Sequence, residues 1–284
     1  MAIRIPSFTY NGSYRTEMIG DYWYIFFLTS GTLRMDYSKT ADLYLHGGGG
    51  GGSNSGYNSS GGSGGGGGWL ESHFGISVNA GTAYDIVIGD GGAAGRPGAT
   101  SGGKGGTSSA FGKSVEGGNG GTYMGNPGTG GSGNGGSRSS AVGGIAGDGE
   151  SNTTYAFNDS SLGLLYGGGG AGGGPEYGAN GQPGKPYGGA GTTSAVANTG
   201  AGGGGAHFSS SETGQKGGAG GSGIVILRGY QDDILPVKFN GTTLTRMIFD
   251  GSEVKHLIHN GTRLFTERFK EWSKPKTLSL QPAH

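Results

Sequence analysis

Hydrophobic residues gather in short stretches along the chain, and no stretch repeats with a helical period. In residues 1–46, β-favouring stretches alternate with turn residues. The longest apolar cluster, residues 22–28, has the length of a strand. Asn11 and Gly12 form a dipeptide that is typical of a hairpin turn. This pattern predicts three or four strands of an antiparallel sheet.

Strand patterns return twice more. Residues 69–89 carry two apolar stretches around a turn, which predicts a β-hairpin between glycine tracts. In residues 223–230, a run of four aliphatic residues is apolar on both faces, as in a strand buried within a sheet. Together with the N-terminal strands, these segments predict one β-domain over residues 1–230 with a glycine-rich insert at 91–221.

The glycines are concentrated in one part of the chain. Of the 73 glycines among 284 residues, 66 lie in residues 47–223. They form clusters without a strict Gly-X-Y register, which excludes collagen. Two interpretations of the insert remain open. One is a flexible Gly/Ser linker, and the other is an ordered bundle of polyglycine-II helices.

Three features favour the ordered bundle. The insert carries large aromatic and aliphatic side chains, for which a linker has no use. Strands of the same predicted β-domain precede and follow the insert, so a disordered loop of this length between them would be unusual. Polyglycine-II helices have no internal hydrogen bonds, so their amides must bond to neighbouring chains, and only glycine allows that close approach. The segments between glycine tracts then become loops at the ends of the bundle.

The remaining residues, 237–284, contain a ten-residue repeat. Each repeat has Asn-Gly or Asp-Gly between β-favouring residues, at positions 240–241, 250–251 and 260–261. These pairs suit type I′ turns, so the segment predicts a small β-meander. Such a sheet is marginal alone, and we expect it to pack on the first domain or to act in oligomerisation or attachment. The predicted fold class is therefore all-β: an antiparallel β-sandwich, an inserted polyglycine-II bundle and a C-terminal meander.

Charge and cysteine content exclude several classes of protein. The 19 basic and 19 acidic residues cancel, so the positive field of a nucleic-acid-binding protein is missing. No apolar segment has the length of a membrane span, so we expect no membrane insertion. The absence of cysteine excludes disulfides and thiolate metal sites. The N-terminus lacks the apolar run of a signal peptide, and we expect synthesis in the cytoplasm.

No motif for catalysis or cofactor binding is complete. The glycine-rich stretches near Lys104 and Lys113 each miss a Walker A loop by one residue. Acidic residues are scattered through the insert, unlike the clustered carboxylates of a glycosidase. We therefore expect neither an enzyme nor a cofactor. The histidines show no metal-ligand spacing, which leaves only a metal on an oligomer axis open. The histidines are His46, His73, His207, His256, His259 and His284.

Aromatic residues in the insert are the candidate binding residues. They lie in segments rich in Gly, Asn, Ser or Pro, which resemble the binding loops of antibodies. They could stack on sugar rings or fill a protein pocket, or they could cap the bundle and shield its amides from water. By contrast, residues 162–166 indicate a structural role. The six candidates are Tyr123, Tyr155, Phe157, Tyr177, Tyr187 and Phe208.

Four blocks of the sequence resemble the glycine-rich domain of tailed-bacteriophage virion proteins. They are residues 24–33, residues 41–46 running into polyglycine, residues 84–92 and residues 220–228. Their order and spacing are similar to those of the family, and the repeat in the tail is similar to the ends of many such proteins.

The resemblance implies a polyglycine-II bundle on a β-sandwich that recognises the host through loops, as in tail-fibre tip adhesins. The expected partners are a host cell-surface glycan or outer-surface protein, other virion tail proteins, and further copies of the chain in a homo-oligomer, with a trimer favoured. The expected location is the virion tail. The alternative is a structural decoration or tail-connector protein without receptor binding.

Overall fold

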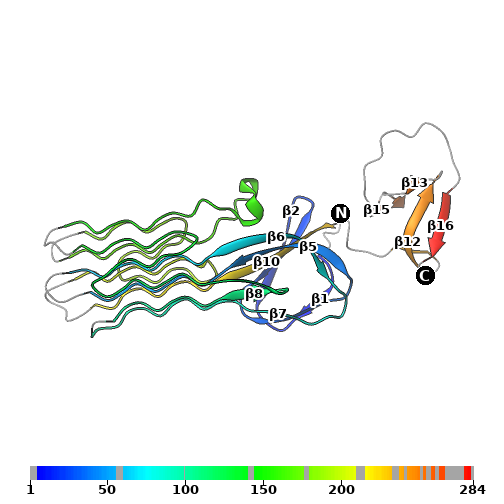
Figure 1. The fold of residues 1–284 in the computed structure, drawn as a ribbon. Coiled ribbons are helices and arrows are strands. Elements are labelled where there is room, and N and C mark those ends of the chain that lie inside the picture. The colour runs from blue at the N-terminus through cyan, green and yellow to red at the C-terminus, as the bar shows by residue number, and fades with distance from the viewer. Residues whose placement is uncertain are drawn as a thin grey trace.

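The computed structural model describes residues 5–55, 60–98, 100–139, 144–175, 179–208 and 215–231, and the backbone of six strands nearer the C-terminus. The described chain is all-β, as predicted, and its only helical segments are two short 3₁₀ turns. Among the described residues, no helix has the length and apolar character that crossing a bilayer requires. Figure 1 shows a β-sandwich from which glycine-rich segments, lying side by side, project to one side.

Two antiparallel sheets form the sandwich. The small sheet has the order β1–β4–β7 and the large sheet the order β2–β3–β10–β5–β6. The strands of the small sheet are β1 (Phe8–Tyr10), β4 (Gly31–Met35) and β7 (Tyr84–Ile86). Those of the large sheet are β2 (Tyr14–Ile19), β3 (Tyr22–Phe27), β10 (Ile224–Tyr230), β5 (Lys39–His46) and β6 (Leu70–Val78).

The core lies between the two sheets. In β3, Trp23, Ile25 and Phe27 alternate toward the small sheet and are fully buried, as the two-residue period of a strand requires. The prediction of a buried strand at the end of the glycine region is confirmed. Strand β10 lies between β3 and β5, with Ile224 to Leu227 buried on both faces.

Two predicted hairpins are wrong. Strands β6 and β7 follow each other in the sequence, but β6 pairs with β5 in the large sheet and β7 pairs with β4 in the small sheet. In the same way, β1 pairs with β4 and β2 pairs with β3, so the turn at Asn11 carries the chain between sheets. The Asn11 side-chain oxygen accepts a hydrogen bond from Thr32 N at 2.6 Å, which fixes this crossing.

The outer face of the large sheet is also apolar. Tyr24, Phe26 and Tyr44 point to this side and are fully buried. Residues 152–166 cover them, a segment we call the arm. It contains the 3₁₀ turns η1 (Ala156–Asn158) and η2 (Ser160–Leu162) and lies over the sheet in Figure 1. The central strands β3 and β10 are therefore buried on both faces, which explains the nearly continuous apolar sequence of β3.

The glycine region forms a bundle of extended helices joined through their backbones. The helix of residues 47–55 is central, and successive amides along it donate to three different neighbours. Every third residue returns to the same neighbour, which is the periodicity of polyglycine II. Three successive bonds run from Gly50 N to Gly66 O (2.8 Å), from Gly51 N to Gly103 O (2.9 Å) and from Gly52 N to Gly218 O (2.8 Å).

The carbonyl groups of the central helix accept from three further helices. The bonds run from Gly118 N to Gly48 O (2.8 Å), from Gly92 N to Gly49 O (2.7 Å) and from Gly203 N to Gly50 O (2.9 Å). Six neighbours thus surround one helix, and its backbone groups are satisfied although it has no internal hydrogen bonds. The bundle therefore extends beyond the predicted 91–221, because residues 47–55 and 60–68 form part of its centre.

Close packing explains the glycine content. A Cβ built on Gly49 would lie 1.9 Å from the carbonyl oxygen of Ala201, which no real contact allows. Helices at the surface of the bundle need fewer glycines. In residues 100–107, every third residue carries an exposed side chain, namely Ser101, Lys104 and Thr107, and the two between are glycine. Uninterrupted glycine marks the interior of the bundle, and Gly-Gly-x marks its surface.

The remaining strands are short. A hairpin of β8 (Ser108–Ala110) and β9 (Lys113–Val115) lies beside the sandwich. Toward the C-terminus, β11 (Val237–Phe239), β12 (Thr242–Phe249) and β13 (Ser252–Glu253) pair in sequence, and β16 (Leu278–Pro282) also pairs with β12. Strand β14 (Leu257–His259) pairs with β15 (Thr262–Phe265). In each of the three hairpins, the register leaves two residues between the strands, as the Asn-Gly and Asp-Gly pairs predict.

Candidate functional site

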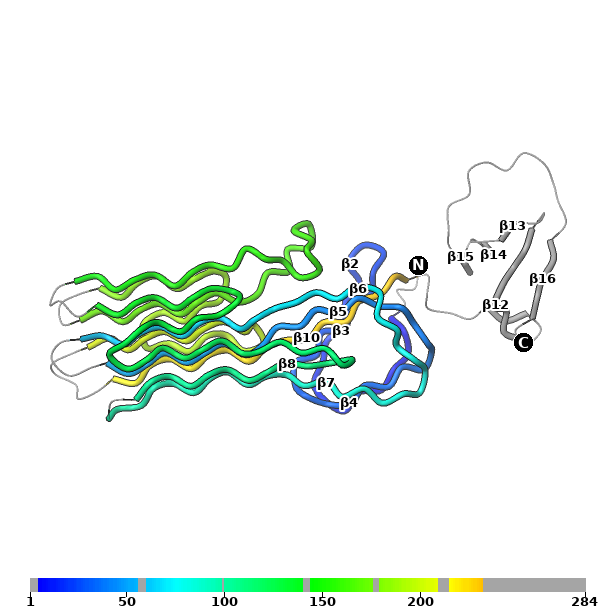
Figure 2. Tube along the Cα trace, in the orientation of Figure 1, coloured from blue at the N-terminus to red at the C-terminus, as the bar shows by residue number. Residues whose placement is uncertain are grey.

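The end of the bundle away from the sandwich is the candidate binding surface, and we call it the distal end. Figure 2 shows the glycine helices running side by side to this end. At about 3.1 Å per residue, the nine residues of helix 47–55 give that helix a length of about 28 Å. Described helices end here at residues 55, 139, 175 and 208 and begin again at 60, 144, 179 and 215. Each of these pairs of ends is joined by residues outside the described part of the chain.

Small polar side chains replace glycine inside the distal end. Ser53, Asn54 and Ser63 are at most 2% exposed. The Ser53 hydroxyl oxygen accepts from Ser63 N at 2.8 Å, and the Ser63 hydroxyl donates to Gly125 O at 2.8 Å. These bonds tie the turn around Gly125 to the central helices. At the distal end, hydrogen bonds from side chains therefore join the helices in addition to those between backbone groups.

Tyr123 lies in this turn and is half-buried. Its backbone N–H donates to the Ser101 hydroxyl at 2.9 Å, which holds the turn against a neighbouring helix. Met124 follows with a positive φ of 49° and is 43% exposed. The Arg138 guanidinium donates to Met124 O at 2.9 Å. The turn thus carries an aromatic ring and an exposed thioether, and the half-buried Arg138 of another helix holds its backbone.

Phe208 also lies at the distal end and is half-buried. Its backbone N–H donates to Gly174 O at 3.0 Å, so it continues the bundle's hydrogen-bond pattern to the last described residue of its helix. Tyr177 lies outside the described residues. Met124 and Arg138 were not among the residues predicted from the sequence, because only the aromatic residues of the insert were candidates.

Phe157 is not at the distal end, and its assignment as a binding residue is corrected. It is 3% exposed and belongs to the arm on the outer face of the large sheet. Its ring centroid lies 6.1 Å from those of Tyr24 and Tyr44, and the Arg228 guanidinium lies 4.2 Å above it. Arg228 is itself paired with Asp42 at 3.0 Å. Phe157 therefore fastens the arm to the sheet.

Replacing Phe157 with leucine should lower the free energy of unfolding by about 1 kcal/mol, because the change keeps most of the buried volume but loses the ring contacts. Urea denaturation would measure this loss. Binding to any partner at the distal end should stay unchanged, and a loss of binding in a fully folded variant would contradict the assignment.

Tyr155 and Tyr187 also lie near the sandwich. Tyr155 is half-buried and forms an isolated β-bridge with Leu165 within the arm. The Tyr187 ring lies 6.5 Å from that of Tyr166, which packs on the same face of the large sheet. Burial raises the pKa of Tyr166 to about 12, so its hydroxyl stays protonated at neutral pH. The prediction of a structural role for residues 162–166 is confirmed.

The order of the glycine helices decides at which end of the bundle each candidate residue lies. Successive helices run in opposite directions, so the connections between them alternate between the two ends of the bundle. The connections that contain Tyr123 and Phe208 fall at the distal end, whereas those with Tyr155 and Tyr187 fall at the sandwich. Counting helices along the sequence would have given this separation.

One buried histidine lies where the sheet meets the bundle. His46 is fully buried, and its Nδ1 lies 2.9 Å from Gly47 O. Burial lowers its pKa from 6.5 to about 4, so the ring is neutral at physiological pH. No group of three potential metal ligands occurs among the described residues. His256, His259 and His284 lie outside the residues whose side chains are described.

A family model for a glycine-rich domain matches residues 29–230. The chain belongs to the glycine-rich domain family. A search of curated proteins finds no match to it. The matched part of this glycine-rich domain runs from the residues before β4 to the end of β10, and so contains most of the sandwich and the whole bundle. The family unit is therefore the two parts together, with the central helices and the strands that anchor them.

Proposed function

We propose that this glycine-rich domain protein belongs to the tail tip or tail fibre of a tailed bacteriophage and recognises the host cell surface through the distal end of its bundle. The observation that carries the proposal is a bundle of hydrogen-bonded glycine helices, anchored on the sandwich, whose far end carries the described turn of Tyr123 and Met124. The four sequence blocks that resemble phage virion proteins support it, because they form β3 to β5, the residues from β7 into the bundle, and β10 with the residues before it.

Rigidity favours binding at such an end. The backbone of each interior glycine helix is fixed by hydrogen bonds to its neighbours, so little conformational entropy is lost when a partner orders the surface. The turn that holds Tyr123 and Met124 supplies side chains that the glycine helices lack. The proposed partner is a host-surface glycan or outer-surface protein, and the contact residues are Tyr123, Phe208 and Tyr177, with Met124 and Arg138 beside Tyr123.

Competition for phage adsorption tests the proposal. Purified protein should reduce adsorption of the phage to its host, and Tyr123→Ala and Phe208→Ala should weaken that competition by about tenfold each, as expected for aromatic residues that anchor an interface. Tyr187→Ala is the matched control, because Tyr187 is an exposed tyrosine at the opposite end of the bundle. Equal competition by all three variants would refute binding at the distal end.

A structural role in the virion is the alternative, as a decoration or tail-connector protein. The specific observation in its favour is that Phe157 and Tyr166 serve the packing of the arm and so are not free to bind. We also expect a homo-oligomer, with a trimer favoured. A reconstruction of the virion would decide, since a binding role requires the distal end to face outward and a connector role requires it to contact another virion protein.

A further inference from the structure

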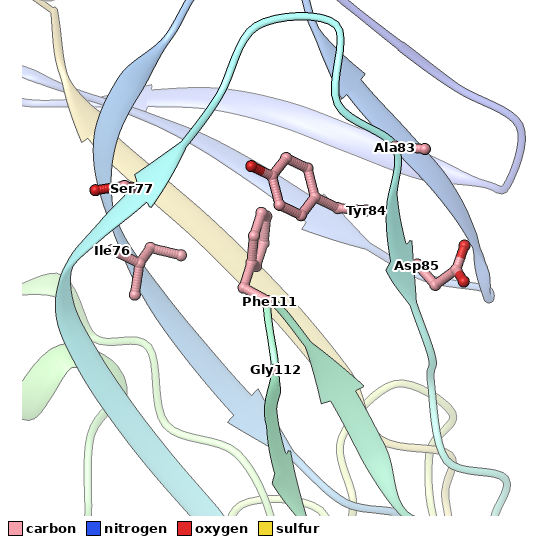
Figure 3. Close-up of a pocket in the computed structure, with 7 residues that line it drawn as sticks. All are labelled: Ile76, Ser77, Ala83, Tyr84, Asp85, Phe111 and Gly112. Carbon is pink, nitrogen blue, oxygen red and sulfur yellow. The ribbon is translucent and has the colours of Figure 1, made fainter.

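A hollow of about 510 Å³ lies at one side of the sandwich, at the other end of the glycine bundle from the distal end. Its volume falls within the range of small-molecule sites in proteins. Strand β6, the start of β7 and the turn between β8 and β9 surround it, as Figure 3 shows. The lining residues are Ile76, Ser77, Ala83, Tyr84, Asp85, Phe111 and Gly112.

Two aromatic rings and an aliphatic side chain form the apolar part of the hollow. The Tyr84 and Phe111 ring centroids are 4.7 Å apart and the rings are tilted by 42°. Both rings, with Ile76, pack against the core on one side and remain partly exposed on the other. The hollow thus offers ring surface that the sandwich itself leaves uncovered.

Polar groups lie beside the rings. The Tyr84 hydroxyl oxygen accepts from Asn79 N at 2.9 Å, so its own proton remains to be donated. Ser77 is exposed on the opposite side of the rings from Asp85 (Figure 3). The Asp85 carboxylate accepts from the Thr32 hydroxyl at 3.1 Å through one oxygen, and it lies at the rim. The hollow is open to solvent and combines apolar faces with hydroxyl groups.

The backbone at Phe111 is strained. Phe111 and Gly112 join β8 to β9 with φ values of 51° and 71°, as in a type I′ turn. The first position of this turn favours asparagine, and a bulky side chain there costs conformational energy. Strain of this kind is a reason to look for a function. This position nevertheless holds a phenylalanine, and its ring lines the hollow.

We propose that the hollow binds a single saccharide ring. The apolar C–H face of the sugar would stack on Phe111 and Tyr84, and one of its hydroxyls would accept the proton of the Tyr84 hydroxyl. A sugar suits a site that stays open, because the ligand keeps much of its polar surface in water. This site is separate from the distal end and does not depend on it.

The test uses the full-length protein and a panel of free hexoses, 6-deoxyhexoses and N-acetylhexosamines. Saturation-transfer NMR should show contact between the protein and the ring protons of at least one sugar. In Phe111→Asn the apparent Kd should be about tenfold weaker, from loss of the stacked ring. Phe111→Tyr should bind like the wild-type protein, because it keeps the ring.

Phe111→Asn is a clean variant because Asn-Gly is the preferred pair for this turn, so the hairpin should form at least as well. Circular dichroism and a melting curve would verify the fold. Tyr123→Ala, at the distal end, should bind the sugar normally even if it alters host adsorption. The proposal is overturned if no sugar in the panel binds, if Phe111→Asn binds unchanged, or if Phe111→Tyr loses binding equally.

Discussion

Replacing Gly50 with alanine should lower the free energy of unfolding by about 3 kcal/mol, the upper part of the range for overpacked sites. The added Cβ would lie 2.0 Å from Asn119 O and 2.4 Å from Asn119 C, which are backbone atoms of a neighbouring helix. Because Gly50 is also bonded to Gly66 and Gly203, the central helix cannot shift without breaking these bonds. A loss of this size corresponds to a drop in Tm of about 6 to 12 °C, which calorimetry would measure.

Gly103→Ala is the matched control in the same bundle. Its Cβ would meet Ala93 N at 3.0 Å and no other atom closer than 3.5 Å. Alanine also restricts the unfolded chain, which offsets part of the remaining crowding. The free energy of unfolding should therefore change by less than about 1 kcal/mol. If both variants melted at the same temperature, the close packing around the central helix would not be what requires glycine.

Stability should fall by about 3 kcal/mol as the pH drops from about 6.5 to about 4, because of His46 alone. Burial lowers the pKa of His46 to about 4, whereas the histidine of the unfolded chain has a pKa of 6.5. Between these values the unfolded state binds a proton that the folded state does not bind, so acid favours unfolding. Above a pH of about 6.5 neither state is protonated, and this contribution does not change.

The surroundings of His46 explain why the proton is excluded. Cβ atoms built on Gly167 and Gly200 would lie 2.9 Å and 2.0 Å from ring nitrogens of His46, so the ring is enclosed by the bundle. The Nε2 atom has no hydrogen-bond partner among the described residues. A positive charge there would be buried without compensation.

Urea denaturation of the wild-type protein and of His46→Gln at several pH values would isolate this effect. Glutamine keeps a polar side chain but does not titrate. The difference in unfolding free energy between the two proteins should change with pH below about 6.5 and stay constant above it. A difference that is independent of pH down to about pH 4 would show that His46 is not buried in its neutral form.

The sequence predicted the individual strands better than their partners. The apolar runs of β3 and β10 were predicted as strands, and each is buried on both faces. Strands β6 and β7 were also found, but their pairing was not, because a short turn between two strands is compatible with a hairpin or with a crossing to the other sheet. Which occurs depends on the core that Ile86 and Val78 share with the rest of the sandwich.

The candidate binding residues were likewise found from the sequence, but their positions in the fold were not. Composition singled out aromatic residues in the insert, but composition cannot say at which end of the bundle a connection lies. The order of the glycine helices decides that, and it places Tyr123 and Phe208 far from Phe157. Phe157 in addition became a core residue, because the outer face of the large sheet carries Tyr24 and Tyr44 and needs an apolar cover.

The long runs of glycine already favoured packing through the backbone in the middle of this chain, since such runs leave only amide and carbonyl groups to hold it together. The positions of the Asn-Gly and Asp-Gly pairs also predicted which strands of the C-terminal repeat pair with each other. The three-dimensional structure was needed to show which strands share a sheet, which glycine helix lies at the centre and which segment covers the outer face of the large sheet. Those choices rest on contacts between residues far apart in the chain, and such contacts depend on the shape of the whole fold.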